Sequence, residues 1–275
     1  HCRLTGRMFQ RVSPVDGQSY AIGFEMRLPR NWNGRFFYQA NGGIDGSVVT
    51  ATGVIGGAGW LDNALNKGFA VLSSDAGHGS PAPFFGLDPQ ARLDYGYQAV
   101  GKLTPMAKSA IQTAYGKVPD RSYIGGCSNG GRHAMVAAAR YADQYDGVMA
   151  GDPGTRLPLA AIANIAGAQG YASLATTPSD PATGFTQAER TLVSRAVLAK
   201  CDALDGAIDG MVQNNAACQA AFDLDRDVPT CSGARDGSCL SAAQKTTIDG
   251  LFKGARTSTG TKFYTSFPYD AGLNT

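Results

Sequence analysis

The chain has 275 residues, of which 43% are hydrophobic and 17% are charged, a composition that provides for a substantial core and excludes an intrinsically disordered protein. Its formal net charge is +2 and its basic residues are scattered, so neither nucleic acid nor a membrane surface is expected as a partner. No segment approaches about 18 consecutive apolar residues, and we expect no transmembrane helix.

Segments typical of strands and of helices alternate over the first 160 residues, which is the pattern of an α/β fold. In chain order we expect a strand at 20–29, a strand at 35–40, a short helix at 60–67, a strand at 69–74, a helix at 104–115, a strand at 121–125, a helix at 132–141 and a strand at 145–151. This order predicts the middle of a doubly wound, mostly parallel sheet.

The pattern changes after about residue 160. An Ala-rich helix is followed by a Pro/Thr/Ser connection at 176–183, a second helix at 187–200 and loops rich in cysteine, with little strand signal. Because parallel sheets bind ligands at the loops after their strands, we expect this part to cap a site. We assign 1–160 to part of an α/β core and 161–275 to the start of an inserted lid, and expect the rest of the lid and the C-terminal core to be absent from the chain.

Four of the six cysteines lie between Cys201 and Cys239 and include no CxxC pair, which favours disulfides over zinc. These four allow three pairings, of which the local one joins Cys201 to Cys218 and Cys231 to Cys239. Closing the first loop contributes roughly 3 kcal/mol in the chain-entropy model. We therefore expect a secreted or periplasmic protein, and a processed or trimmed N terminus because the chain begins at His1 without an initiator Met.

A Gly-x-Ser-x-Gly pattern lies between the expected strand 121–125 and the expected helix 132–141. Gly126, Ser128 and Gly130 match the nucleophile elbow, in which a strand turns sharply into a helix and exposes the serine hydroxyl. The alternative is a glycine-rich turn with an incidental serine. The strand, turn and helix occur in the required order, so we predict that Ser128 is a nucleophile.

A serine nucleophile in acyl transfer needs two hydrogen-bond donors for the oxyanion. In this architecture they are the N–H after the nucleophile and an N–H from a loop after an earlier strand. The N–H of Asn129 and the N–H of Gly43, which follows the aromatic strand 35–40, occupy these positions. An ordinary turn is the alternative for Gly43.

The chain has no histidine after His133, although the order Ser, acid, His is expected for this architecture. His133 lies on the elbow helix itself, which prevents the usual approach to Ser128. We expect His78, in a glycine-rich turn, to hold loops together near the site, and Asp152 to form a turn rather than to act as the triad acid. The triad is therefore incomplete within this chain.

Three segments together resemble the tannase and feruloyl esterase family. They are Gly125 to Arg132 around the serine, Trp32 to Phe36 and Ser74 to His78, so the resemblance extends over much of the chain. The resemblance implies an α/β-hydrolase core with a large lid that hydrolyses esters of aromatic acids, of feruloyl, galloyl or terephthalate monoester type, without an organic cofactor.

The same resemblance implies that Cys127 forms a disulfide with a cysteine directly after the catalytic histidine. The matching Asp and His-Cys are not in the sequence, and we expect them beyond Thr275 or in a second, disulfide-linked C-terminal chain. By resemblance, the partner of Cys2 also lies outside the chain.

The segment 201–211 is an acidic loop with glycines that permit a tight turn. Hard carboxylate oxygens on such a loop suit calcium, although the order is not that of an EF-hand. A solvated acidic turn is the alternative. The resemblance implies a structural calcium in the lid, held by the side chains of Asp202, Asp205 and Asp209 and by the carbonyls of Ala207 and Met211.

The sequence thus predicts a serine-dependent carboxylic ester hydrolase that acts on a small aromatic ester through an acyl-enzyme. A second hypothesis is a non-catalytic, calcium-stabilised subunit or fragment that needs a partner chain.

Overall fold

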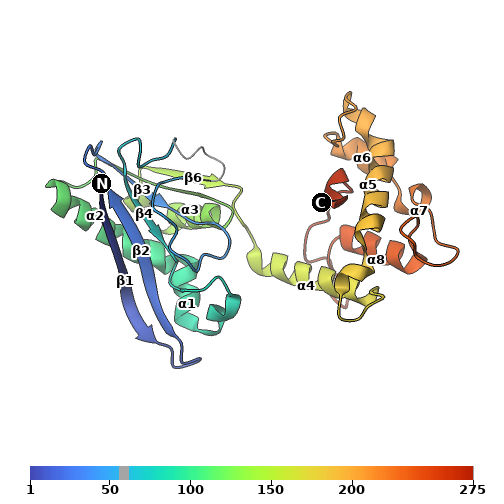
Figure 1. Ribbon diagram of the computed structural model, residues 1–275, viewed down its shortest axis with the longest axis horizontal. Coiled ribbons are helices and arrows are strands. Elements are labelled where there is room, and N and C mark those ends of the chain that lie inside the picture. The colour runs from blue at the N-terminus through green and yellow to red at the C-terminus, as the bar shows by residue number, and fades with distance from the viewer. Residues whose placement is uncertain (56–61, 275) are drawn as a thin grey trace. The chain divides into compact units, whose positions relative to one another are not determined.

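The computed structural model describes residues 1–55 and 62–274. The chain divides into two compact units, His1–Thr155 and Arg156–Thr275 (Figure 1). The division lies close to residue 160, where the sequence pattern changes. Each unit has its own hydrophobic core.

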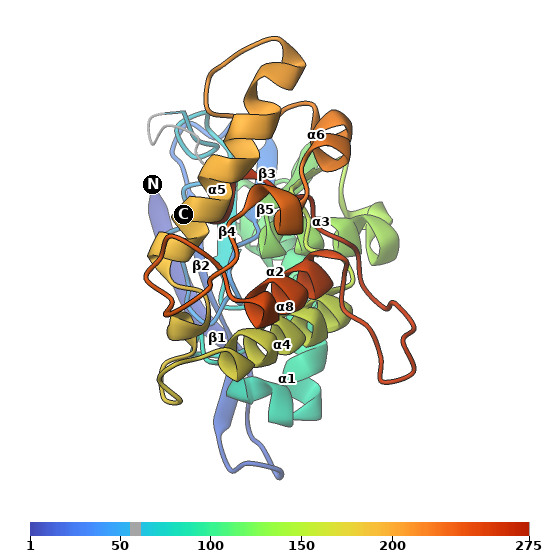
Figure 2. The same cartoon turned by 90° about the vertical axis from the view of Figure 1, so that its right-hand side faces the viewer.

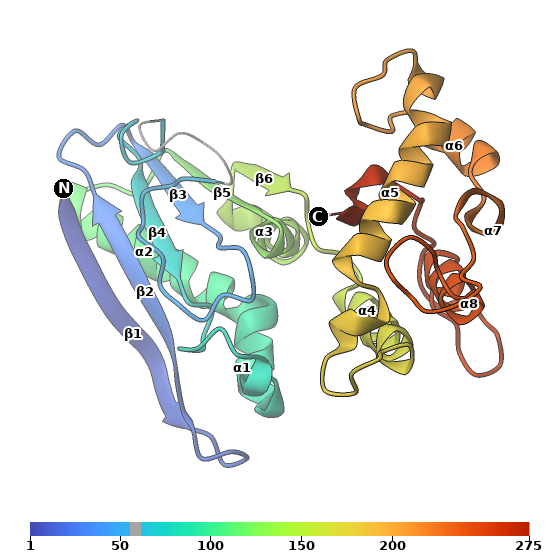
Figure 3. The same ribbon diagram turned by 45° about the vertical axis from the view of Figure 1, so that its right-hand side comes forward.

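The first unit is built on a sheet of six strands in the order β1-β2-β4-β3-β5-β6 (Figure 3). The strands are β1 (Cys2–Val12), β2 (Ser19–Leu28), β3 (Arg35–Gln39), β4 (Ala70–Ser74), β5 (Arg121–Cys127) and β6 (Gly147–Gly151). Strands β4, β3, β5 and β6 pair in parallel, whereas β1 pairs with β2 and β2 with β4 in antiparallel fashion. The predicted α/β class with a mostly parallel sheet is confirmed.

Side chains alternate between the two faces of the central strands, as the pleat requires. Phe36 and Leu72 point into a cluster that includes Leu103 of helix α2 (Ala99–Tyr115) and Ala137 of helix α3 (Asn129–Arg140). Phe37 and Val71 point to the opposite face, where the loop after β3 packs on them. Helix α3 follows β5 directly, so the sheet and this helix together fix the position of Ser128.

Two expected elements of this unit differ in the structure. Residues 60 and 61 of the expected helix 60–67 lie outside the described residues, and residues 62–68 form turns. The Asn63 side chain accepts a hydrogen bond from the Asn66 N–H at 2.8 Å, as an N-cap does, but the turn that it opens ends at Gly68, where φ is 86°.

Helix α2 begins at Ala99 rather than at residue 104 and continues through Pro105. Proline removes one backbone hydrogen bond, but its ring is exposed, and the turn before it buries Val100 and Leu103 in the core. Burial of that turn outweighs the missing bond. Helix α1 (Pro89–Leu93), capped by the side chain of Asp88, lies shortly before α2.

The second unit is helical. Its helices are α4 (Leu157–Ser173), α5 (Gln187–Cys201), α6 (Asn215–Ala221), α7 (Leu224–Asp227) and α8 (Ala242–Phe252). Helices α4 and α8 lie beside each other (Figure 2). Helices α5 and α8 each begin with a capping box, and the small core between them includes Val193, Leu240 and Ile248.

The second unit contains two disulfides, which join Cys201 to Cys218 and Cys231 to Cys239. The local pairing is therefore the one in the structure. Within the described residues, every helix is too short or too polar to span a bilayer.

Candidate active site

Ser128 lies at the sharp turn between β5 and α3. Its backbone has φ 59° and ψ −118°, outside the regions that non-glycine residues ordinarily adopt, and its side chain is exposed. The Ser128 N–H donates to Gly151 O at 2.9 Å, and Ser128 O accepts from the N–H groups of Arg132 and Gly154 at 3.0 and 3.2 Å. This backbone conformation is the strained turn that the Gly-x-Ser-x-Gly pattern predicts.

Glycine is required on both sides of Ser128 because other backbone passes very close. A Cβ atom at Gly126 would lie 2.4 Å from Ala40 O, and one at Gly130 would lie 2.3 Å from the same oxygen. The end of β3 therefore packs directly on the elbow. This contact brings the loop after β3 next to Ser128.

The loop after β3 is held by a set of buried side chains. Asn41 donates from Nδ2 to Ser73 Oγ at 3.0 Å and to Ser74 O at 2.8 Å, both at the end of β4. Gly43 has φ 64°, and no atom lies within 4 Å of a Cβ placed on it. Open space at this position suits a backbone N–H that must approach a substrate, as predicted for Gly43.

A cavity of about 480 Å³ opens beside Ser128. Its walls come from the end of β3, the loop that follows it and the elbow, and include Asn41, Gly42, Val49, Ile55, Cys127 and Ser128. Gln39 braces this loop by accepting from the N–H groups of Thr52 and Gly53 at 3.1 and 2.7 Å. The cavity thus combines an exposed hydroxyl with apolar and polar walls, as an ester site requires.

His133 is buried and does not contact Ser128. Its Nε2 lies 2.8 Å from Asp45 Oδ2, and the Arg132 guanidinium lies against its ring. Burial lowers the pKa of His133 below its ordinary value, against the opposing effect of the hydrogen bond to Asp45. The imidazole is therefore neutral at neutral pH and is used within a buried network.

His78 and Asp152 also have local partners. His78 is buried, bonds through Nε2 to Ile44 O at 2.8 Å and stacks on Phe85 with ring centroids 3.7 Å apart. This arrangement ties two loops together. Asp152 has φ 38°, and its Oδ2 lies 3.9 Å from the Sγ of Cys127, which is a free thiol in the structure.

Sequence reasoning missed Asp45, whose carboxylate connects the loop after β3 to the elbow helix. Asp45 Oδ2 accepts a hydrogen bond from Asn129 Nδ2 at 2.6 Å as well as that from His133. The residue has φ 56° and is 9% exposed. Its position in an Asp-Gly pair identifies a turn, but the sequence gives no signal for partners so far along the chain.

The acidic loop of the second unit uses its carboxylates to bind its own backbone. Asp202 Oδ1 accepts from the N–H groups of Asp209 and Gly210 at 3.1 and 3.0 Å, and Asp205 accepts from those of Ala207 and Gln213 at 3.1 and 3.0 Å. The hydrogen bonds from the N–H groups of Gln213 and Ala207 hold the pKa of Asp205 below its ordinary value.

All three carboxylates offer hard oxygens, which suits calcium by donor chemistry. Within residues 1–55 and 62–274, however, no three acidic, histidine or cysteine side chains are grouped closely enough to hold a metal ion.

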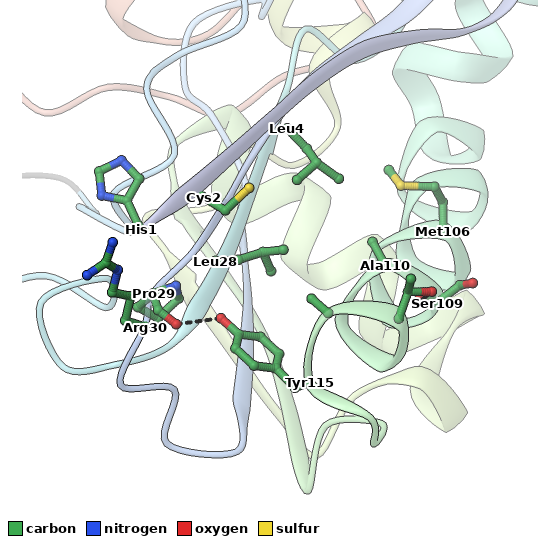
Figure 4. Close-up of a pocket in the computed structure, with 12 residues that line it drawn as sticks. His1, Cys2, Leu4, Leu28, Pro29, Arg30, Met106, Ser109, Ala110 and Tyr115 are labelled. Atoms are coloured by element: carbon green, nitrogen blue, oxygen red, sulfur yellow. Dashed lines mark hydrogen bonds between the residues drawn. The ribbon is translucent and has the colours of Figure 1, made fainter.

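A larger cavity, of about 740 Å³, lies between the first residues of β1, the end of β2 and helix α2 (Figure 4). Its walls include Leu4, Leu28 and Met106, and the Tyr115 hydroxyl donates to Pro29 O at 2.6 Å beside it. The residues predicted for catalysis do not line it. We therefore place the candidate active site at the smaller cavity, which contains Ser128.

Comparison with protein families and with curated proteins identifies the family of the chain. Residues 2–274 match the family model described as "Tannase and feruloyl esterase". The chain is similar to mono(2-hydroxyethyl) terephthalate hydrolase of Piscinibacter sakaiensis, with 39% identity over 295 residues that cover 100% of this chain and 49% of that protein. It is also similar to a probable feruloyl esterase B-1 of Neosartorya fischeri, with 31% identity over 83% of this chain and 41% of that protein. The chain spans about half the length of these relatives.

Solved structures share the fold. Feruloyl esterase B from Aspergillus oryzae superposes with a TM-score of 0.74 at 23% identity, over 98% of this chain and 56% of that chain. Tannin acyl hydrolase from Aspergillus niger superposes with a TM-score of 0.65 at 18% identity, over 98% of this chain and 53% of that chain. These superpositions support the α/β fold class.

Proposed function

The chain belongs to the tannase and feruloyl esterase family, and from this premise we propose that it carries the nucleophile of a carboxylic ester hydrolase that acts on esters of aromatic acids. The observation that carries the proposal is Ser128, exposed at φ 59° on the turn between β5 and α3 and facing the cavity of about 480 Å³. The names of the relatives support a feruloyl or terephthalate monoester type of substrate, and the family description, which includes tannase, supports a galloyl type.

The proposed reaction is acyl transfer in two steps. The Oγ of Ser128 attacks the ester carbonyl and loses its proton to a base, while the N–H groups of Asn129 and Gly43 donate to the oxyanion. Collapse of the tetrahedral intermediate expels the alcohol, which takes up the proton, and leaves an acyl-enzyme. Water then adds to the acyl carbonyl and releases the aromatic acid and the serine hydroxyl.

Neither buried histidine of the first unit, His78 or His133, is the base of this reaction. His78 and His133 are buried and bonded to Ile44 and Asp45, and burial lowers the pKa of both. We therefore propose that the acid and the histidine come from outside these 275 residues. Cys127, a free thiol next to Ser128, supplies a point of attachment for the segment or second chain that brings them.

Structural calcium at the acidic loop and export from the cytoplasm are further parts of the proposal. The carboxylates of Asp202, Asp205 and Asp209, with the carbonyls of Ala207 and Met211, offer hard oxygen donors by chemistry. The carboxylates bond to backbone N–H groups and are not grouped around one point in the described residues, so binding of the ion would require this loop to rearrange. The reaction uses no organic cofactor. Two disulfides within the second unit support a secreted or periplasmic protein, because thiols stay reduced in a cytosol.

The second candidate is a non-catalytic subunit that is stabilised by calcium and needs a partner chain. The burial of His78 and His133 away from Ser128 favours it, because a serine without a base is a poor nucleophile.

Replacement of the nucleophile decides between the two candidates. In the full-length protein, Ser128→Ala should reduce hydrolysis of an aromatic ester by on the order of 10⁴-fold or more, because the acyl-enzyme no longer forms. The control, Ser109→Ala, replaces an exposed serine on α2 and should leave the rate unchanged. Steady-state kinetics and labelling with a fluorophosphonate provide the measurement. Turnover retained by Ser128→Ala would remove Ser128 from the mechanism.

A further inference from the structure

Asp45 bonds to the residue that follows the proposed nucleophile. Its Oδ2 accepts from Asn129 Nδ2 at 2.6 Å and from His133 Nε2 at 2.8 Å, and only 2% of its side chain is exposed. Asn129 supplies one proposed oxyanion donor through its backbone N–H. Gly43, two residues before Asp45, supplies the other. One carboxylate therefore connects the two segments that carry these donors.

The Asp45 side of this connection is rigid. The Asp45 N–H donates to Gly42 O at 3.3 Å, which closes a tight turn around Gly43. Ile44 O bonds to Nε2 of the buried His78 at 2.8 Å. Asp45 itself has φ 56°, a left-handed conformation that a non-glycine residue keeps only when its surroundings enforce it.

The Asn129 side is fixed in orientation. Asn129 Oδ1 accepts from Arg132 Nε at 2.7 Å and from the Tyr95 hydroxyl at 3.1 Å. Arg132 is in turn anchored by its bond from Nη1 to Gly96 O at 2.9 Å. Because two donors face Oδ1, the Asn129 amide must point its Nδ2 toward Asp45. The carboxylate is thus the acceptor that completes the network.

We propose that Asp45 is a positioning residue that sets the spacing between the N–H groups of Gly43 and Asn129 and so preorganises the oxyanion hole. This inference rests on the proposed function of Ser128. Oxyanion donors stabilise the transition state only when they already point at the developing charge. A shift of either segment changes the distance between the two donors, and the Asp45–Asn129 bond opposes such a shift.

The test uses the full-length protein and compares kcat, KM and inhibition by an arylboronic acid, whose tetrahedral adduct with serine mimics the transition state. Asp45→Ala removes the acceptor, and Asn129→Asp places two carboxylates against each other. For each variant we expect kcat to fall and boronate binding to weaken on the order of 10- to 100-fold, with a change in KM of less than about threefold.

A reciprocal variant distinguishes positioning from simple loss of stability. Asp45→Asn combined with Asn129→Asp exchanges donor and acceptor across the same contact, so we expect a higher kcat than the product of the two single effects predicts. The matched control is Asp88→Asn, which alters a carboxylate that is 1% exposed in the same unit and bonded to Arg11. It should lower the melting temperature without changing the ratio of boronate affinity to KM.

The inference is overturned if the Asp45 and Asn129 variants affect kcat and boronate binding no more than Asp88→Asn does, or if the reciprocal variant restores nothing. Where Asp45→Ala does not fold, Asn129→Asp carries the same comparison. Turnover retained by Ser128→Ala would instead overturn the proposed function, so the two failures are distinguishable.

Discussion

Asp75 carries a carboxyl group into the interior of the first unit, at the end of β4. It is 6% exposed, and its Oδ1 accepts from the N–H groups of Gly23 and Gly77 at 2.9 Å each. Burial raises the pKa of Asp75 to about 6, an effect that outweighs the two hydrogen bonds, which favour the charged form. The folded protein therefore holds this proton more tightly than the unfolded chain does.

This pKa predicts the sign of a pH effect on stability. Between the ordinary value of 3.8 and about 6, the folded state binds more protons than the unfolded state, so the contribution of Asp75 to stability is complete below pH 3.8 and is lost as the pH rises through 6. Asp75→Asn resembles the protonated form at every pH. We expect the unfolding free energy of the wild type, relative to this variant, to fall by on the order of 2–3 kcal/mol between pH 4 and 7.

Urea unfolding of both proteins at several pH values measures this difference. Asp143→Asn, which replaces an exposed carboxyl, serves as the control for the substitution itself. A difference between wild type and Asp75→Asn that stays constant with pH would contradict the raised pKa.

At the same scale, the elbow was predictable and the network below it was not. Gly126, Ser128 and Gly130 are adjacent in sequence, and the conformation they adopt is set by local sterics. The bonds from Asp45 to Asn129 and His133 join residues 84 and 88 positions apart. Only the pairing of β3 with β5 brings these residues together, and no local pattern encodes that contact.

Among the elements, those with a buried and regular pattern were predictable. Strands β2 to β5 and helices α3 and α5 occur where the sequence indicates, because each buries part of its length in a core. Strand β6 also occurs where the sequence indicates, although its Val148 and Met149 are exposed. Strand β1 (Cys2–Val12) is largely exposed and rich in Arg, so it lacks that pattern and forms through its pairing with β2. Helix α8 was missed because polar residues occupy much of its length, although Gln244 and Lys245 are buried through specific hydrogen bonds.

The acidic loop after α5 provides a prediction at the scale of an element. Each of Asp202, Asp205 and Asp209 accepts hydrogen bonds from backbone N–H groups of its own loop. Calcium would replace weak local bonds by ionic contacts and would stabilise only the folded loop. We expect removal of calcium with EGTA to lower the melting temperature by on the order of 5 °C, and calcium to restore it.

Differential scanning calorimetry of wild type and Asp205→Asn tests this prediction. The variant should lose most of the response to EGTA. Asp236→Asn, an exposed carboxylate of the same unit that bonds to Ser238, should keep it. An equal melting temperature of the wild type with EGTA and with calcium would exclude the ion from this loop.

At the scale of the molecule, the proposed nucleophile Ser128, the loop of the proposed oxyanion donor Gly43 and the cavity all lie within His1–Thr155, whereas the buried His78 and His133 bond to Ile44 and Asp45. The fold class and the position of Ser128 on a turn between a strand and a helix were predictable from patterns local in the sequence. The source of the base could not be predicted from them, because a triad is assembled by tertiary structure from residues far apart in sequence. Under the proposed function, the triad is therefore completed only in the full-length protein.

This conclusion predicts different behaviour for the 275-residue chain alone and for the full-length protein. The chain alone should react with a fluorophosphonate at least about 100-fold more slowly, because its serine has no general base.

Intact mass with and without reductant, measured on the full-length protein, then shows how the missing part is attached: a species that falls to the mass of this chain on reduction identifies a second chain held by a disulfide. Cys127→Ser should abolish that linkage while Cys2→Ser, at the other free thiol, should leave it intact. Labelling of the chain alone at the full rate would mean that His78 or His133 leaves its buried partner to act as the base.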